Sequence, residues 1–300
     1  MRATASPMTP IVTPIVTRFA PSPTGLLHIG HAYSALFAED AARKTADGRF
    51  VLRIEDIDAS RCRPEFEAAL YEDLHWLGLC WETPVRRQSD HMNDYAAALE
   101  TLGRDGLLYP CFCTRKDLRS EAAASASAPH GPDGPVYPGT CRALSAHARK
   151  SRIDGGAPYA LRLDMEKAVR TLKDPLSFHD QARGRIAVDP LGCGDVVLAR
   201  KDIRTSYHLA VVIDDALQGV TLVTRGEDLL HATHVHRVLQ TLLNLPEPAY
   251  HHHALLYDSS GKRFAKRDAG VTLATLRAGG ATRADIRQMI NLAESHPPGP

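Results

Sequence analysis

Hydrophobic and polar positions change their period along the chain, and the period predicts which segments are strands and which are helices. Near the start, short apolar runs at 15–20 and 50–54 predict two strands. Between them, apolar residues three and four positions apart predict a helix over 29–45. The Pro- and Gly-containing segment 21–27 joins the first strand to this helix. The chain therefore opens with a predicted strand–helix–strand unit.

The later part of the chain repeats this alternation of helices and strands. Helical spacing is clear at Phe66, Leu70, Leu74 and Leu77. The further helices are expected over 65–77, 90–102, 209–217 and 228–243, and the further strands over 159–163, 196–198 and 220–223. Between 121 and 138 the chain is rich in Ala, Ser, Pro and Gly, which predicts a low-complexity loop inside a small subdomain. Strands that alternate with helices indicate an α/β fold with a parallel sheet.

Composition narrows the class of protein. A chain of 300 residues that is 44% hydrophobic can bury the core of one large or two ordinary domains. Its 36 Lys and Arg balance 35 acids, so no broad basic field supports sequence-independent binding of DNA, and any RNA contact is expected to be local. We found neither a signal peptide nor a long apolar run. We therefore expect a cytoplasmic monomer with no membrane partner.

The first candidate site is the loop that opens the first predicted helix, at His28-Ile29-Gly30-His31. Backbone N–H groups and the helix dipole at such a position favour phosphate. Gly30 lets the backbone approach a ligand, and both imidazoles can donate hydrogen bonds to phosphate oxygens as negative charge builds on them. The pattern indicates an ATP site, and the alternative is a turn with two solvated histidines.

A second candidate is the basic segment 262–267, in which four of six residues are cations. Such a loop could close over a triphosphate and stabilise the leaving pyrophosphate. Taken alone, a short basic run is more typical of a solvated surface loop. This segment therefore supports an ATP site only in combination with the first motif.

Cysteine spacing gives a candidate metal site. Cys111, Cys113 and Cys141 fall in one subdomain, and thiolates suit tetrahedral zinc. The alternative is a small reduced core without metal. A bound zinc would be structural, because no histidine or acid beside the thiols suggests an open catalytic position. Three consecutive histidines at 251–253 alternate their faces on a strand, so we interpret them as structural.

The motif His28-Ile29-Gly30-His31 and the basic segment 262–267 together resemble the two signature motifs of class I aminoacyl-tRNA synthetases. Segments 18–25, 52–58 and 213–228 are further similar to the catalytic domain of glutamyl-tRNA synthetase, and the resemblance covers most of 17–290. The second motif departs from the family pattern, with Phe264 and Ala265 in place of a smaller apolar residue and a serine. Loss of that hydroxyl is expected to weaken contacts with ATP.

The resemblance implies roles for particular residues. It implies that Arg18 and Arg225 contact the carboxylates of glutamate, that Glu55 lies near the α-ammonium, and that Tyr207 forms a pocket wall. The other implied contacts are Ala20 and Ser22 for glutamate, Gly30 and Lys262 for ATP, and His28, His31 and Lys266 for both ATP and catalysis. Two arginines favour glutamate over glutamine, whose amide would leave charge uncompensated. An ordinary ion pair at strand ends is the alternative for Arg18 and Glu55.

The resemblance also implies an architecture and cofactors. The expected fold is a class I synthetase Rossmann-like parallel sheet with an inserted zinc-binding-type subdomain and a helical C-terminal part. The expected domain boundaries place a flexible extension at 1–16 and the two halves of the catalytic domain at 17–108 and 159–245. The inserted subdomain is expected at 109–158, and the basic loop with short helices at 246–300. Tyr137 is implied as the fourth zinc ligand, with His130 and His147 as alternatives. Magnesium is expected to enter with ATP.

Within the family, the chain most resembles a shortened branch that lacks the helical anticodon-binding half. That branch activates glutamate without RNA and passes it to the queuosine base of tRNA(Asp). One alternative is a compact synthetase that charges tRNA(Glu), and another is a silent paralogue that binds glutamate, nucleotide or RNA. A third is a nucleotidyltransferase of the same superfamily. The residue chemistry alone does not show which acceptor is used.

Overall fold

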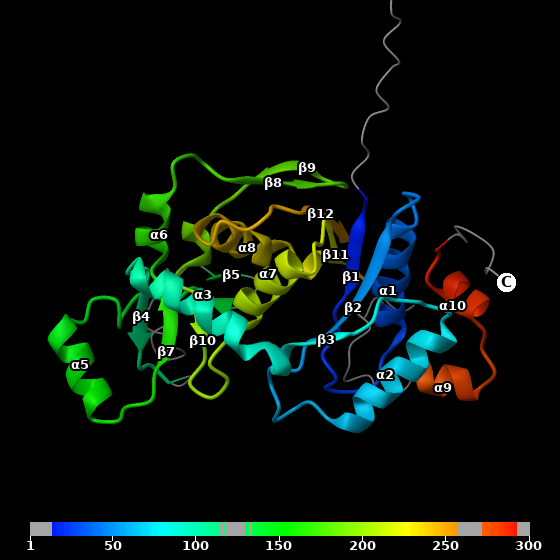
Figure 1. Cartoon of the computed structure of the whole chain (residues 1–300), viewed down its shortest axis with the longest axis horizontal. Helices are drawn as coiled ribbons and strands as arrows, with labels where there is room; N and C mark the ends of the chain where they lie inside the picture. Colours follow the sequence, from blue (N-terminus) through cyan, green and yellow to red (C-terminus); the bar gives the residue numbers. More distant parts are fainter. Residues whose placement is uncertain (1–13, 115–116, 118–129, 132–133, 257–271, 293–300) are drawn as a thin grey trace, which may run out of the picture.

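A computed structural model describes residues 14–114, 117, 130–131, 134–256 and 272–292. Its central layer consists of two parallel sheets that lie edge to edge (Figure 1). The first sheet contains β1 (Val16–Phe19), β2 (Arg49–Ile54) and β3 (Arg86–Arg87). The second has the order β11 (Leu222–Gly226), β12 (Ala249–His253), β8 (Ser177–Asp180) and β9 (Gly184–Ala187), of which only β9 is antiparallel to its neighbour. The expected α/β fold with a parallel sheet is confirmed.

The two sheets meet between β1 and the residue before β11. The backbone N–H of Thr221 donates to the Val16 carbonyl at 3.0 Å, and the Thr221 hydroxyl accepts from the Val16 N–H at 2.8 Å. The strand β1 therefore has β2 on one side and β11 on its other side. Such a reversal of strand order in a parallel sheet opens a crevice at the carboxyl ends of the strands.

Several helices cover this layer and bury its apolar side chains. The helices of the described residues are α1 (Ile29–Ala42), α2 (Pro64–Trp76), α3 (Met92–Arg104), α5 (Ala146–Asp154), α6 (Met165–Thr171), α7 (Tyr207–Leu217), α8 (Leu230–Leu242), α9 (Leu273–Ala278) and α10 (Arg283–Met289), of which α5 has no buried residue. Single 3₁₀ turns lie at Gln88–His91, Leu191–Cys193 and Glu227–Leu229. Small side chains let α1 approach the sheet closely, since Ala32, Ala35 and Ala38 are fully buried. The Thr17 hydroxyl even donates to the Ala38 carbonyl at 2.7 Å.

A separate antiparallel sheet, order β10 (Val197–Ala199), β7 (Ala160–Leu163), β4 (Leu108–Cys111), lies beside the parallel layer. The prediction that the strands near 160 and 197 belong to the parallel sheet was wrong, because β7 pairs antiparallel with both β4 and β10. A two-stranded ladder, β5 (His130–Gly131) and β6 (Gly134–Pro135), completes this region. The domain limits remain a prediction. We propose that the inserted subdomain continues through β10, because this sheet joins chain on both sides of residue 158.

The two C-terminal helices dock onto α1 and α2. Leu273 of α9 and Ile286 of α10 are fully buried. Three arginines of these helices form ion pairs with acids of α1 and α2: Arg283 with Glu39 at 3.0 Å, Arg287 with Asp40 at 2.5 Å, and Arg277 with Glu72 at 2.9 Å. The segment after the second candidate motif is thus fixed to the first half of the sheet.

Asp73 of α2 provides a pH-dependent element at this contact. Its side chain is fully buried, and neither carboxylate oxygen has a hydrogen-bond partner in the described structure, although Arg277 Nη2 lies 3.5 Å away. Burial raises the pKa of Asp73 to about 6, against the opposing charge of Arg277. Between about pH 4 and pH 6 the folded protein holds this proton while the unfolded chain has lost it, so this group makes stability fall as pH rises.

We expect Asp73→Asn to remove this dependence. The difference in unfolding free energy between Asp73→Asn and the natural protein should change by about 2 kcal/mol from pH 4.5 to pH 7.5, in favour of the variant at the higher pH. Urea unfolding at several pH values measures this difference. Two parallel stability curves would contradict a raised pKa for Asp73.

Candidate active site

A pocket of about 560 Å³ opens at the carboxyl ends of β1, β2, β11 and β12, where the order of the strands reverses. Its lining includes nine of the eleven residues expected from the sequence to bind glutamate or ATP: Arg18, Ala20, Ser22, His28, Gly30, His31, Glu55, Tyr207 and Arg225. The remaining two, Lys262 and Lys266, lie outside the described residues. Arg18 and Arg225, which are more than 200 positions apart in sequence, thus share one cavity.

The two histidines of the first motif form the cap of α1. His28 is the N-cap residue, and its Nδ1 accepts from the Gly30 N–H at 3.1 Å. His31 Nδ1 accepts from the His28 N–H, also at 3.1 Å. A neutral imidazole whose Nδ1 is an acceptor carries its hydrogen on Nε2. Each ring can therefore offer an Nε2–H as a donor to a ligand while Nδ1 fixes its orientation.

The space at position 30 favours glycine. A Cβ placed there would lie 3.0 Å from His28 Cε1 and 3.1 Å from His28 Nδ1. A side chain at this position would thus press on the ring that caps the helix, which would have to shift by a few tenths of an ångström. The two imidazoles are also in contact, with their centroids 3.9 Å apart. Gly30 therefore maintains a compact pair of rings at the helix start.

Arg225, at the end of β11, points its guanidinium into a set of uncharged acceptors. Its Nη1 donates to the Tyr207 hydroxyl and to His236 Nδ1, both at 3.2 Å. Its Nη2 donates to the Thr233 hydroxyl at 2.6 Å, and its Nε to His252 Nε2 at 3.2 Å. The residue is only 5% exposed. Among its contacts in the described structure there is no carboxylate, so a buried positive charge faces the pocket.

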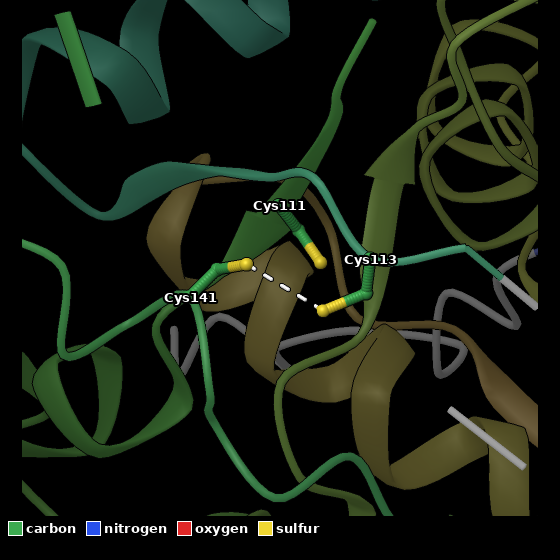
Figure 2. A group of neighbouring side chains, drawn as sticks. All are labelled: Cys111, Cys113 and Cys141. Atoms are coloured by element: carbon green, nitrogen blue, oxygen red, sulfur yellow. Dashed lines mark hydrogen bonds between the residues drawn. The ribbon is translucent and has the colours of Figure 1, made fainter. Parts of the chain in front are cut away.

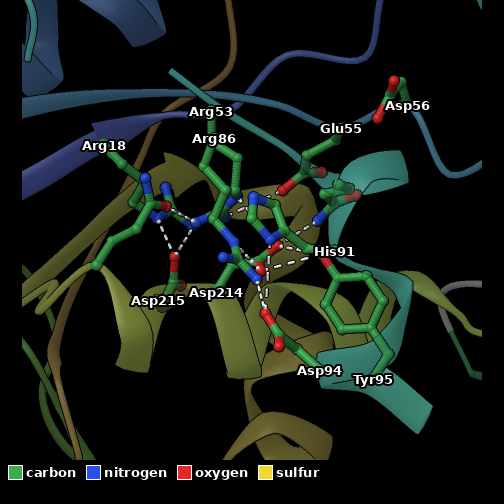
Figure 3. A network of polar contacts seen from close by, with 12 residues as sticks. Arg18, Arg53, Glu55, Asp56, Arg86, His91, Asp94, Tyr95, Asp214 and Asp215 are labelled. Carbon is green, nitrogen blue, oxygen red and sulfur yellow. Dashed lines mark hydrogen bonds and ion pairs between the residues drawn. The ribbon is translucent and has the colours of Figure 1, made fainter. Parts of the chain in front are cut away.

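Arg18, the second arginine of the pocket, is held by an ion pair. Its Nε lies 3.2 Å from Asp215, and its Nη1 donates to the Thr224 carbonyl at 2.9 Å. Asp215 also accepts from Nη1 of the fully buried Arg53 at 2.8 Å, as Figure 3 shows. The alternative interpretation of Arg18 as an ion-pair residue is thus correct for one edge of its guanidinium, and the same residue lines the pocket.

Glu55 follows β2 and supplies the pocket with a carboxylate. It accepts from Arg53 Nη2 at 3.1 Å. Burial raises the pKa of Glu55, and the nearby guanidinium groups of Arg53 and Arg18 oppose that rise. The pocket lining therefore contains the acids Glu55 and Asp228 together with the two arginines, Arg18 and Arg225.

Asp214 is the centre of the polar network beneath the pocket (Figure 3). Its carboxylate accepts from Arg86 Nε at 2.7 Å, from Gln88 Nε2 at 2.8 Å and from the Tyr95 hydroxyl at 3.0 Å. Arg53 Nε lies 3.7 Å away. Asp214 is fully buried and does not line the pocket. No catalytic role was expected for Asp214 and Asp215, and their contacts join α7 to β2 and β3.

The interpretation of residues 251–253 as structural was incomplete. His253 lines the pocket, with its Nε2 3.2 Å from the Ser34 hydroxyl. His252 faces the other way and contacts Arg225. His236 and Thr233 on α8 were also missed. The available signal was their place on the strand and helix that follow β11, because strand ends of one parallel sheet gather at the same edge.

The three arranged cysteines converge in the inserted region (Figure 2). Their sulfur atoms all lie within 4.8 Å of one another, and those of Cys113 and Cys141 are 3.5 Å apart. The Tyr137 hydroxyl lies 3.5 Å from Cys111 Sγ and 3.6 Å from Cys113 Sγ. A tetrahedral ion with metal–sulfur bonds of about 2.3 Å separates its sulfurs by about 3.8 Å. The group can therefore hold a metal ion.

Comparison with known proteins gives the family. The profile of the tRNA synthetases class I (E and Q) catalytic domain matches residues 14–297. The Glutamyl-Q tRNA(Asp) synthetase of Rhodobacter capsulatus is 50% identical over 283 residues, which cover 93% of this chain and 100% of that relative. The chain belongs to the class I tRNA synthetases of the E and Q group. The enzyme of the same name from Nocardia farcinica is 43% identical and is covered over 86% of its length.

Solved structures agree with this class I synthetase fold. A glutamate tRNA ligase from Elizabethkingia meningosepticum, solved in complex with its amino acid, superimposes with a TM-score of 0.68 and 29% identity. The match covers 86% of this synthetase and 53% of the ligase, so the chain spans about half the length of that ligase. None of the helices in the described part of the synthetase has the length and apolar character needed to span a bilayer.

Proposed function

We propose that the protein activates L-glutamate with ATP to glutamyl-adenylate without RNA and then transfers the glutamyl group to the queuosine base in the anticodon loop of tRNA(Asp). The names of its relatives from Rhodobacter capsulatus and Nocardia farcinica support this acceptor. The residues that line the pocket support glutamate as the amino acid substrate.

The observation that carries the choice of glutamate is the environment of Arg225. A buried guanidinium whose partners among the described residues are all uncharged retains its full charge for a ligand, and an uncompensated buried charge costs several kcal/mol. A ligand carboxylate supplies the missing anion. A glutamine amide would not, so the site should select glutamate. Arg18 provides a second cation, and Glu55 is suited to the α-ammonium.

The proposed first step needs no protein nucleophile. A carboxylate oxygen of glutamate attacks the α-phosphorus of ATP in line, the bond from that phosphorus to the bridging oxygen breaks, and pyrophosphate leaves. The Nε2–H groups of His28 and His31 would stabilise charge on the phosphate oxygens. Lys262 and Lys266 would act on the leaving pyrophosphate. Magnesium bound to ATP supplies further neutralisation of phosphate charge.

In the second step, a hydroxyl of queuosine attacks the carbonyl carbon of the adenylate, and AMP leaves with the electron pair of the broken bond. Transfer to the 3′ end of tRNA(Glu) is the competing outcome, because a glutamate tRNA ligase of Aquifex aeolicus is also 37% identical to the chain. The chain covers 54% of that ligase. The acceptor is therefore tested separately from activation.

Glutamate-dependent ATP–pyrophosphate exchange by the purified protein without tRNA tests the first step, with glutamine and aspartate as controls. Exchange with glutamate alone supports RNA-independent activation. No exchange without tRNA would refute it, and exchange that requires tRNA(Glu) would favour the compact synthetase. Labelled glutamate is then offered to tRNA(Asp) with and without queuosine. Incorporation only into the queuosine form supports the proposed acceptor.

We further propose that the cysteine group holds a structural zinc ion with Tyr137 as the fourth ligand. Three thiols and one phenol oxygen converge, and the Tyr137 oxygen also accepts from the Cys141 N–H at 2.8 Å. His147 is exposed and is not part of the metal-ligand group found in the described chain, and the side chain of His130 lies outside the described features. Burial raises the pKa of Cys113 to about 12, so a nearby cation is needed for it to act as a thiolate.

We expect about one zinc per chain in the natural protein and less than a tenth of that in Cys141→Ser, because three ligands no longer close the site. The melting temperature should fall with the zinc content. Elemental analysis and thermal denaturation provide the two readouts. Cys80→Ser, at an exposed cysteine outside the group, is the matched control and should keep its zinc. Equal zinc in both variants would exclude Cys141 as a ligand.

A further inference from the structure

Arg225 is surrounded by side chains that can orient it but cannot neutralise it. Its acceptors come from three elements: Tyr207 on α7, Thr233 and His236 on α8, and His252 on β12. A guanidinium has five N–H donors, and these four contacts use four of them. The plane of the group is therefore fixed, and one Nη2–H remains for a ligand.

His252 can accept from Arg225 only in one tautomer, and Asp180 selects it. Asp180 Oδ2 lies 2.6 Å from His252 Nδ1, and both side chains are fully buried. An ionised carboxylate only accepts and a guanidinium only donates, so the hydrogen must be on Nδ1 and the lone pair on Nε2. Backbone N–H groups of Ala182 and Arg183 donate to the other oxygen of Asp180 at 2.9 and 3.0 Å. These bonds hold the carboxylate in place.

His236 is fixed in the opposite tautomer. Its Nδ1 faces Arg225 and must accept, so its Nε2 carries the hydrogen and donates to His208 Nδ1 at 3.2 Å. The residue is 2% exposed. Burial and the charge of Arg225 lower the pKa of His236 well below its usual value, which keeps the ring neutral. Two histidines of different tautomers thus hold two different nitrogens of one guanidinium.

A buried Asp–His pair can also serve as a general base, but this one is not placed to do so. His252 Nε2 lies 3.2 Å from Arg225 Nε and 3.1 Å from the Thr233 hydroxyl, and His252 does not line the pocket. No substrate atom can reach its lone pair without displacing Arg225. The pair therefore acts on Arg225 and not on the substrate.

We propose that His236, His252 and Asp180 are positioning residues that fix the guanidinium of Arg225 and thereby set the affinity of the pocket for the glutamate carboxylate. This inference rests on the proposed activation of glutamate. Because its acceptors within the described part of the chain are all neutral, the arginine is oriented without losing the charge that the substrate needs. A direct carboxylate partner would orient the group equally well but would compete with the ligand.

His236→Leu and His236→Asn form the matched test. The Asn Oδ1 can occupy the place of Nδ1 and accept from Arg225, whereas Leu leaves a buried charged donor without a partner. In glutamate-dependent ATP–pyrophosphate exchange we expect His236→Leu to raise the KM for glutamate about 10- to 100-fold, with the KM for ATP and the kcat at saturating glutamate within about threefold of the natural protein. His236→Asn should stay within about threefold in all three constants.

Asp180→Asn tests the tautomer directly. An amide can donate to His252 Nδ1, which allows the hydrogen to move to Nε2, where it opposes the Arg225 N–H. We expect ¹⁵N NMR of the histidine side chains to show His252 as the Nδ1–H form in the natural protein and as the Nε2–H form in Asp180→Asn. The KM for glutamate should rise in that variant as in His236→Leu.

The results of these experiments distinguish a failure of the proposed function from a failure of the positioning role. If the natural protein neither exchanges pyrophosphate with glutamate nor binds glutamate in calorimetry, the proposed function and this inference both fail. If the natural protein is active and His236→Leu leaves the KM for glutamate unchanged, only the positioning role fails. Equal losses in His236→Leu and His236→Asn, or a loss confined to kcat and thermal stability, would also overturn it in favour of a packing role.

Discussion

Arg225→Ala is expected to lower kcat/KM for glutamate in ATP–pyrophosphate exchange by about 10³-fold or more. The substitution removes the cation that faces the ligand carboxylate, and each charge-assisted hydrogen bond is worth about 1.5–3 kcal/mol. It also leaves the acceptors on Tyr207, His236 and His252 without their shared donor. A loss of 10³ corresponds to about 4 kcal/mol, which these two effects together can supply. Initial exchange rates over a range of glutamate concentrations measure it.

Two further variants make this result specific. Arg225→Lys keeps the charge but cannot reproduce the four-way contacts of the guanidinium, so we expect it to remain at least about 10-fold impaired. Arg185→Ala removes an exposed arginine of β9 and should leave the exchange reaction unchanged. An Arg225→Ala protein with nearly natural kcat/KM for glutamate would remove Arg225 from the proposed substrate site.

Asp214→Ala is expected to lower the free energy of unfolding by about 3–5 kcal/mol, because removal of one partner leaves buried charges uncompensated. Its carboxylate is fully buried between Arg86, Gln88, Tyr95 and Arg53. After the substitution, Arg86 keeps a contact with Asp94 at 2.5 Å, whereas Arg53 loses one of its three acids. Urea or thermal unfolding of the purified protein measures the loss.

Asp154→Ala is the matched control for this stability effect. Asp154 is an exposed acid at the end of α5 and pairs with Lys150 at 2.8 Å. A surface pair of this kind contributes about 0–1 kcal/mol. A change in unfolding free energy below about 1 kcal/mol for Asp214→Ala would show that the network of Figure 3 tolerates the loss of its centre.

The parts of the site that follow from sequence are local ones. The strand, loop and helix that lead to His28 and His31 are consecutive, so the motif and its helix start could be read together. The pairing of Arg53 with Asp214 and Asp215 could not be predicted from the sequence, because more than 160 positions separate Arg53 from these acids and either acid could have capped a helix. Which arginine meets which acid is decided by packing of α7 against β2.

The strand β12 (Ala249–His253) shows a second part of the site that sequence alone did not predict. Its three histidines were expected to lie on a strand, but their pattern did not indicate that this strand pairs in parallel with β11 or that His253 lines the pocket. Its histidines are accommodated by polar and aromatic partners such as Asp180 and Phe37. The antiparallel pairing of β7 with β4 was missed for a different reason. Alternation of elements along the chain reports their order but not the direction in which strands pair.

The chain leaves the described fold at Leu256, which lines the pocket, and returns at Thr272, which forms a β-bridge with His28 at the start of α1. Fifteen residues join these two points, and they include Lys262 and Lys266. Lys266 is six positions from Thr272, so its Cα cannot be more than about 22 Å from that anchor. The segment that carries both lysines is therefore joined at each end to residues beside the pocket, so under the proposed activation of glutamate the action of either lysine on ATP would be intramolecular.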